Sequence, residues 1–165
     1  MEIRAEASGD VAAIRAVTAA AFENAPFSNQ TEHAIVDALR EAGALSISLV
    51  ATEGIEVIGH VAFSPVRIDR AAGDWYGLGP VSVRPDRQRQ GVGQQLIRRG
   101  LEKIRSRGAE GCVVLGEPAY YGRFGFVSDP DLRFAGAPPG YFQRLVFKGA
   151  PPTGAVGYHA AFGIV

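Results

Sequence analysis

The chain has 165 residues, of which 47% are hydrophobic and 21% charged, and its 17 basic and 17 acidic residues give a formal net charge of zero. This length and composition predict a single globular domain over residues 1–165 with a buried core, and no compositional bias indicates a disordered tail. Balanced charge provides no overall field to attract nucleic acid or an anionic membrane, so any anion site must be local.

The first residues and the cysteine content bear on the compartment. The start, MEIRAEASGD, alternates charges and has no apolar signal core, and no segment has the roughly 20 apolar residues needed to span a bilayer. Cys112, the single cysteine, lies in the apolar run CVVL. This excludes an intramolecular disulfide and favours a buried thiol in a reducing compartment over a catalytic one. We therefore expect a cytoplasmic protein with no nucleic-acid or membrane partner.

The first half of the chain alternates between strand and helix patterns. Apolar residues recur at helical spacing behind capping side chains, Ser8 or Asp10 for one helix and Thr31 with Glu32 for the next. Pro65 should bend its strand or place it at an edge. The pattern predicts a strand at 2–5, a helix at 11–22, a loop at 24–29, a helix at 31–43, an antiparallel hairpin of Leu45–Glu53 and Glu56–Ile68, and a turn-rich loop at Asp69–Asp74.

The second half contains the clearest helix, at 91–107, with apolar residues at helical spacing and basic residues on the other side. Strands Trp75–Val83 and Gly111–Leu115 flank it and predict a parallel βαβ unit. Strands outnumber helices and only this pair is expected to be parallel. The predicted class is α+β, with a mixed, mostly antiparallel sheet and flanking helices. The remaining predictions are a short helix or turn at Pro118–Phe126 and closing strands at Tyr141–Phe147 and Val156–Phe162.

The loop before this helix is suited to bind phosphate. A helix N-terminus offers unpaired N–H groups and positive potential, and glycines let an anion approach the backbone, so Gln88–Gly93 is predicted to cradle a pyrophosphate. A P-loop would need Lys and Ser or Thr where this chain has Gln94 and Gln95. A dinucleotide fingerprint would need a small residue in place of Leu96 and an acid after the next strand. Leu96 weakens the dinucleotide-binding alternative, but an acid, Glu117, does lie near the end of the next strand, so this alternative stays open.

Gln88, Gly91 and Gly93, at Q-x-x-G-x-G spacing behind the strand GPVSV, resemble the acetyl-CoA signature of the GCN5-related N-acetyltransferase (GNAT) family. The later stretch EPAYYGRFGF resembles the family's downstream element, in which an aromatic residue and a tyrosine precede Gly125-Phe126. VIGHVAFSPVRI and GYHAAF resemble its bacterial YhbS-type branch, so the resemblance covers nearly the whole chain. It implies a GNAT-like fold whose βαβ unit forms the acetyl-CoA site.

The resemblance also implies an activity, in which acetyl-CoA is the cosubstrate and its acetyl group passes directly to a primary amine of a small molecule or a protein. The strands ending at Val83 and Leu115 would part to hold the pantetheine arm. No metal is expected, because the three histidines are scattered and no second cysteine accompanies them. The implied cofactor-binding residues are Val81, Ser82, Val83, Gln88, Arg89, Gln90, Gly91, Val92 and Gly93.

Two proton transfers are needed. The resemblance assigns Tyr121 as general acid, since a phenol of pKa about 10 can donate to a thiolate whose thiol has a pKa of about 8.5. The adjacent Tyr120 suits a packing role better. For the base that deprotonates the amine, the candidates are Glu117, Glu32 and His60, besides an ordered-water path. Glu117 follows the strand beside the acetyl site, whereas a lone histidine such as His60 among apolar strand residues is more typical of a hydrogen-bonded core residue.

The acceptor side is expected at the loop Glu23–Thr31 and the second helix, with Phe22 and Phe27 as an apolar wall. The alternative function is a non-catalytic acyl-CoA-binding or sensing module on the same fold, because fold does not determine function. A dimer is compatible with the sequence.

Overall fold

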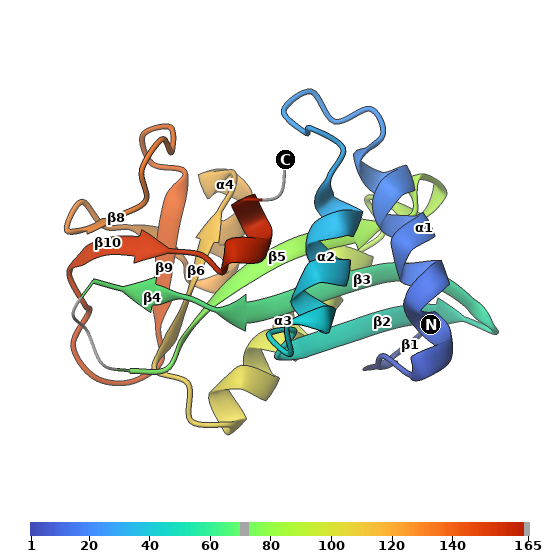
Figure 1. Ribbon diagram of the computed structural model, residues 1–165, viewed down its shortest axis with the longest axis horizontal. Coiled ribbons are helices and arrows are strands. Elements are labelled where there is room, and N and C mark those ends of the chain that lie inside the picture. The colour runs from blue at the N-terminus through green and yellow to red at the C-terminus, as the bar shows by residue number, and fades with distance from the viewer. Residues whose placement is uncertain (70–72, 164–165) are drawn as a thin grey trace.

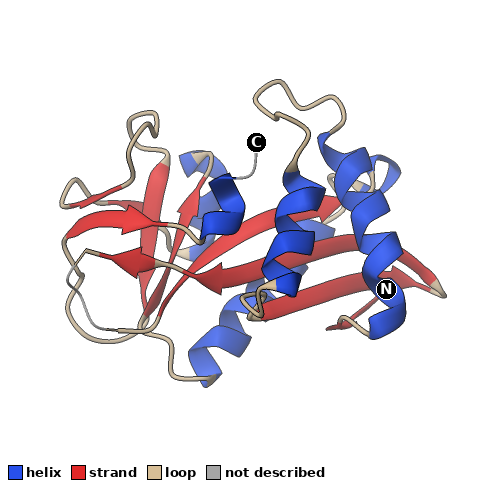
Figure 2. Ribbon diagram, in the orientation of Figure 1, coloured by secondary structure: helices blue, strands red, loops and turns tan. Residues whose placement is uncertain are grey.

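The computed structural model describes residues 1–69 and 73–163, and Figures 1 and 2 show strands covered by helices. Its strands are β1 (Glu2–Ala5), β2 (Ile47–Glu53), β3 (Glu56–Pro65), β4 (Arg67–Ile68), β5 (Trp75–Val83), β6 (Gly111–Leu115), β7 (Val127–Ser128), β8 (Leu132–Arg133), β9 (Phe142–Val146) and β10 (Gly154–Gly157). Its helices are α1 (Val11–Phe22), α2 (Glu32–Glu41), α3 (Val92–Ser106) and α4 (Pro118–Tyr121), with 3-10 turns η1 (Ser8–Asp10), η2 (Pro85–Arg87), η3 (Gly122–Phe124) and η4 (Ala160–Gly163).

The strands of the described chain form two sheets, one of seven strands in the order β1-β2-β3-β5-β6-β9-β7 and one of three in the order β4-β10-β8. In the large sheet β5 and β6 are parallel and the other neighbours are antiparallel. This confirms the α+β class and the βαβ unit formed by β5, α3 and β6. β10 also pairs in parallel with β8, which the sequence did not predict.

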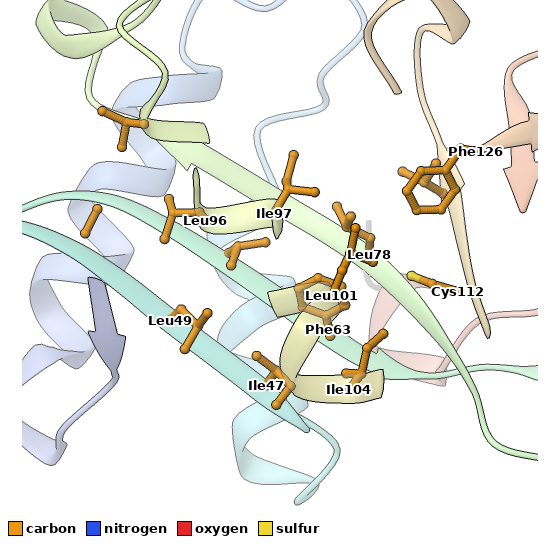
Figure 3. Close-up of a cluster of buried hydrophobic side chains, with 14 of the residues drawn as sticks. Ile47, Leu49, Phe63, Leu78, Leu96, Ile97, Leu101, Ile104, Cys112 and Phe126 are labelled. Atoms are coloured by element: carbon orange, nitrogen blue, oxygen red, sulfur yellow. The ribbon is translucent and has the colours of Figure 1, made fainter. Parts of the chain in front are cut away.

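Helices cover both faces of the large sheet. Figure 1 shows α1 and α2 side by side across one face, and α3 lies on the other. Alternating residues of β2 serve the two layers, since Leu49 packs with α3 while Val50 packs with α1 and α2. Figure 3 shows the α3 side of the core, where Leu96, Ile97 and Ile104 are completely buried against the strands.

The structure corrects the predicted strand Val156–Phe162. β10 ends at Gly157 and the chain then forms η4, because the Ala161 amide donates to His159 Nδ1 at 3.0 Å and Ala161 is buried against α2. The apolar pattern of residues 156–162, on which the strand prediction was based, does not reveal this local hydrogen bond. The two-residue strands β7 and β8 were also not predicted.

Pro65 acts as predicted, because β3 ends there and the chain passes into β4 of the second sheet. Of the predicted loop Asp69–Asp74, residues 70–72 lie outside the described residues. No helix of the described chain has the length and apolar character to cross a membrane.

Candidate active site

The centre of the candidate site is the place where two parallel strands separate. The pairing of β5 with β6 runs from Trp75–Gly111 to Gly77–Val113 and ends there, and the two strands diverge in Figure 1. A bulge bends β5 at this point, since Gly79 and Pro80 together face Ala62 of β3. The facing edges of the two strands beyond the bulge are therefore available to an extended ligand.

Beside this gap, the N-terminus of α3 presents backbone donors. Gly91 caps the helix with φ +85°, in the left-handed region that favours glycine, and its carbonyl accepts the first helical hydrogen bond, from Gln95. The N–H groups of residues 92–94 therefore have no partner within the helix. The first turn of α3 holds no acidic residue, so its positive end is not neutralised by its own side chains.

A groove of about 340 Å³ connects these features. Its wall combines the end of β5, the loop before α3, the start of α3, the end of α1 and one tyrosine of α4. The lining residues are Ala21, Phe22, Ala25, Val81, Val83, Arg87, Gln88, Arg89, Gly91, Val92, Gly93, Gln94 and Tyr120.

The groove brings together most of the residues predicted from the sequence as cofactor ligands. Ser82 and Gln90 are the exceptions. The Ser82 side chain is buried at 1% exposure, and the Gln90 amide donates to the Asp86 carbonyl at 3.4 Å. The contribution of α1 was missed, apart from Phe22, which was expected on the acceptor side. Apart from Phe22, the end of α1 carries only small residues. Any packed helix shows this pattern, so nothing in the sequence marked α1 as part of the groove.

The two arginines that line the groove differ in how their charge is used. Arg87 bonds Glu53 at 2.8 Å and Asp86 at 3.1 Å, whereas Arg89, with φ +63°, has no ion pair among the described residues. Gln88 donates to the Val83 carbonyl at 3.0 Å and so ties the loop to the end of β5. Of the two arginines, Arg89 is thus the one whose positive charge is not paired with a carboxylate of the described chain and can act on a ligand in the groove.

The neighbouring tyrosines of α4 face different surroundings. Tyr120 lines the groove, and a Cβ added to Gly93 would lie 3.4 Å from its hydroxyl. Tyr120 packs against the core cluster of α3 and edge-to-face with Phe124, as expected, and it also borders the groove, which was not expected.

Tyr121 is more deeply placed, against the backbone of Gly116 and edge-to-face with Phe126 at 6.1 Å. Burial raises the pKa of its hydroxyl to about 12, and the nearby Tyr120 and Cys112 add to the effect. The buried Cys112 matches the sequence prediction of an unreactive thiol, with its pKa raised by burial. Tyr121 is therefore fully protonated at neutral pH.

Comparison with known proteins agrees with this geometry, because residues 13–126 match the acetyltransferase (GNAT) family. The chain belongs to the GNAT family. It is 40% identical over 137 residues to the N-acetyltransferase YhbS of Escherichia coli K12, which covers 81% of this chain and 78% of that protein. These matches confirm the family and the YhbS-type branch inferred from the motifs.

Solved structures of GNAT proteins share the fold. A GNAT family acetyltransferase from Brucella melitensis, in complex with acetyl-CoA, is 53% identical with a TM-score of 0.87, over 98% of this chain and 97% of that chain. YhbS from Escherichia coli, in complex with CoA, is 35% identical with a TM-score of 0.86, over 98% and 91% of the two chains. The fold of this chain is therefore the GNAT fold.

The candidate bases of this GNAT protein lie in three separate places. Glu117 is exposed at the N-terminus of α4. Glu32 accepts hydrogen bonds from the Ser28 hydroxyl at 2.7 and 2.8 Å and lines a hollow of about 420 Å³ between α1 and α2. This hollow shares Phe22 with the groove. The fully exposed Phe27 is not among the residues that line either one.

His60 is fully buried on the α1 side of β3, and its Nε2 lies 2.7 Å from the Ser48 hydroxyl. Ser48 donates in turn to Glu6, which pairs with Arg40 at 2.9 Å. Burial lowers the pKa of His60 to about 4, with Glu6 acting against the shift and Arg40 adding to it. The expectation of a hydrogen-bonded core histidine is confirmed.

The sequence did not predict the polar cluster around His60, because its members are far apart along the chain. Within residues 1–69 and 73–163, no group of three His, Cys, Asp or Glu side chains is placed to hold a metal ion.

Proposed function

We propose that this chain is an acetyl-CoA-dependent N-acetyltransferase that moves the acetyl group directly to a primary amine. The observation that carries the proposal is the groove that runs from the end of β5, beyond its last pairing with β6, to the unpaired N–H groups of α3. One surface thus offers a strand edge for an extended arm and a positive helix end for phosphates.

On this proposal the pyrophosphate lies against the backbone of Gln88–Gly93, with Arg89 supplying charge. The pantetheine arm runs along β5, whose Val81 and Val83 side chains line the groove. A backbone N–H of β5 beyond the bulge polarises the thioester carbonyl. Since the Ser82 side chain is buried away from the groove, Ser82 can contribute only through its main chain.

Tyr121 is the proposed partner of the departing sulfur. The CoA thiol has a pKa of about 8.5, so a phenol with a pKa of about 12 holds its proton more tightly than the thiol by 3 to 4 pKa units. Tyr121 therefore stabilises the leaving thiolate by donating a hydrogen bond, and the proton that ends on the thiol comes from the attacking amine or water.

The amine is proposed to enter through the hollow between α1 and α2 that adjoins the groove at Phe22. Glu32 within it and Glu117 at the start of α4 are the two proposed bases. His60 is a poor base, because its lowered pKa gives it little affinity for a proton at neutral pH. Replacing each acid by glutamine and comparing pH–rate profiles distinguishes them, and a profile retained in both variants supports a water path.

Calorimetric titration with acetyl-CoA, with NADH and ATP as controls, tests the cofactor. Thiol release from the same samples against a panel of small amines and amine-bearing peptides tests the transfer. We expect acetyl-CoA alone to bind and at least one amine to accelerate thiol release. Binding without amine-dependent release would favour the acyl-CoA sensor, and preference for a nucleotide control would overturn the cofactor assignment.

A further inference from the structure

The C-terminal segment crosses the sheet face opposite α3. β10 pairs antiparallel with β4 and parallel with β8, and η4 then packs on α2. In Figure 1 this segment, in red, runs from the second sheet to α2. Tyr158 lies between β10 and η4, so its ring position is set by elements on both sides.

The Tyr158 ring lies against β5 where the strands part. Gly77 is the last residue of β5 that pairs with β6, and a Cβ added there would meet Cε1 of Tyr158 at 2.6 Å. The ring also packs against Phe134 and Phe162, with centroids 5.0 and 5.1 Å away. The absence of a side chain at Gly77 is what admits the tyrosine.

Tyr121 has a matching position on the other strand and the other face. Its ring occupies the space of a side chain at Gly116, directly after β6. Tyr121 belongs to the core cluster of α3 and Cys112, whereas Tyr158 belongs to the cluster of Val113. Because consecutive strand residues point to opposite faces, the two tyrosines approach the gap from opposite sides.

The two rings flank the end of the β5–β6 pairing, Tyr158 beside Gly77 and Tyr121 beside Gly116. The Cys112 thiol and the Tyr121 hydroxyl lie near enough to the Tyr158 hydroxyl to raise its pKa further, after the larger effect of burial. None of the hydrogen bonds within the described ranges uses the hydroxyl of Tyr121 or Tyr158. Both hydroxyls are therefore available to a ligand that lies beside the end of the β5–β6 pairing.

We propose that the Tyr158 hydroxyl contacts the acetyl thioester and the incoming amine at the gap between β5 and β6, from the face opposite Tyr121. This inference rests on the proposed function. Tyr158 accepts a hydrogen bond from an N–H of the attacking amine and so directs the nitrogen lone pair to the thioester carbon, while Tyr121 donates to the sulfur. Tyr158 forms no covalent bond and keeps its own proton.

The test uses the full chain labelled with 3-fluorotyrosine, whose five tyrosine resonances are assigned with single Tyr→Phe variants and followed by fluorine NMR. CoA and acetyl-CoA are added separately. The Tyr120 resonance reports occupation of the groove by either compound. We expect Tyr158 to shift differently with acetyl-CoA than with CoA, because the two differ only in the acetyl group. The exposed Tyr141 should respond to neither.

Kinetics give a second readout. Tyr158→Phe keeps the ring and its packing, so its melting temperature should match the wild type. With an amine from the panel, we expect it to lower kcat/KM for the amine about tenfold, equivalent to about 1.4 kcal/mol. The Kd for acetyl-CoA should stay unchanged, and Tyr141→Phe is the matched control.

A Tyr158 resonance that is identical in the free, CoA-bound and acetyl-CoA-bound protein, while Tyr120 shifts, would overturn the inference and leave the proposed function intact. Unchanged kcat/KM for the amine in Tyr158→Phe would do the same. If no tyrosine shifts and no heat of binding is detected, the proposed function falls and this inference falls with it.

Discussion

Lowering the pH from 7 to 5 should destabilise the protein through His60. The pKa of His60 is about 4 in the folded chain, below the value of about 6.5 for an unfolded histidine. The unfolded state therefore binds more protons between these values, so stability is complete above pH 6.5 and falls as the pH drops toward 4. At pH 5 the two pKa values give a loss of about 2 kcal/mol.

Urea denaturation at pH 7, 6 and 5 measures this loss, and a slope of about 2 kcal/mol per molar urea converts it into a midpoint shift of about 1 M. Glu6 does not interfere in this window. Burial raises its pKa, but hydrogen bonds from Arg40 and Ser48 outweigh burial and hold it below the usual value, so its contribution is lost only in more acid solution. His60→Gln retains a group that can bond Ser48 and should flatten the dependence. An equal loss in wild type and His60→Gln would refute the assignment to His60.

The remaining predictions concern the groove. Gly93→Ala should raise stability by up to about 1 kcal/mol, as alanine does within a helix, yet weaken acetyl-CoA about tenfold because its Cβ projects beside the Tyr120 hydroxyl at 3.4 Å. Gly100→Ala on the same helix is the contrast: its Cβ would strike the Phe63 ring, so it should cost about 1–3 kcal/mol in thermal or urea unfolding and leave cofactor affinity unchanged. The reasoning fails if both variants change stability in the same direction. Tyr121→Phe should reduce turnover about 100-fold with little effect on the Kd for acetyl-CoA, and unchanged turnover would remove it from the proposed role.

Sequence reasoning recovered the elements whose signals are local. The amphipathic α3, the flanking strands of the βαβ unit and the glycine turn at Gly91 each follow from short-range periodicity or backbone geometry. The cofactor side of the candidate site was accessible for the same reason, because its predicted residues are nearly contiguous between Val81 and Gly93.

Features that depend on tertiary contacts were not accessible. The turn η4 replaces a predicted strand for two reasons. The His159 ring accepts a hydrogen bond from the Ala161 amide, and Ala161 packs against α2, which lies about 120 residues earlier in the chain. The orientation of Tyr120 and Tyr121 depends on which ring fits over Gly116, which a motif spacing does not encode. The His60 cluster likewise assembles only when β3, β2, α2 and the residue after β1 come together in the fold.

The placement of the C-terminal segment has an evolutionary consequence. The family match ends at residue 126, and the later residues supply β8, β10 and η4 on the face opposite α3. Substitutions and insertions there can accumulate without disturbing the loop and helix start at 88–94. A lineage can therefore vary the surroundings of Tyr158, and with them the fit of the acceptor, while the loop that holds the cofactor stays the same.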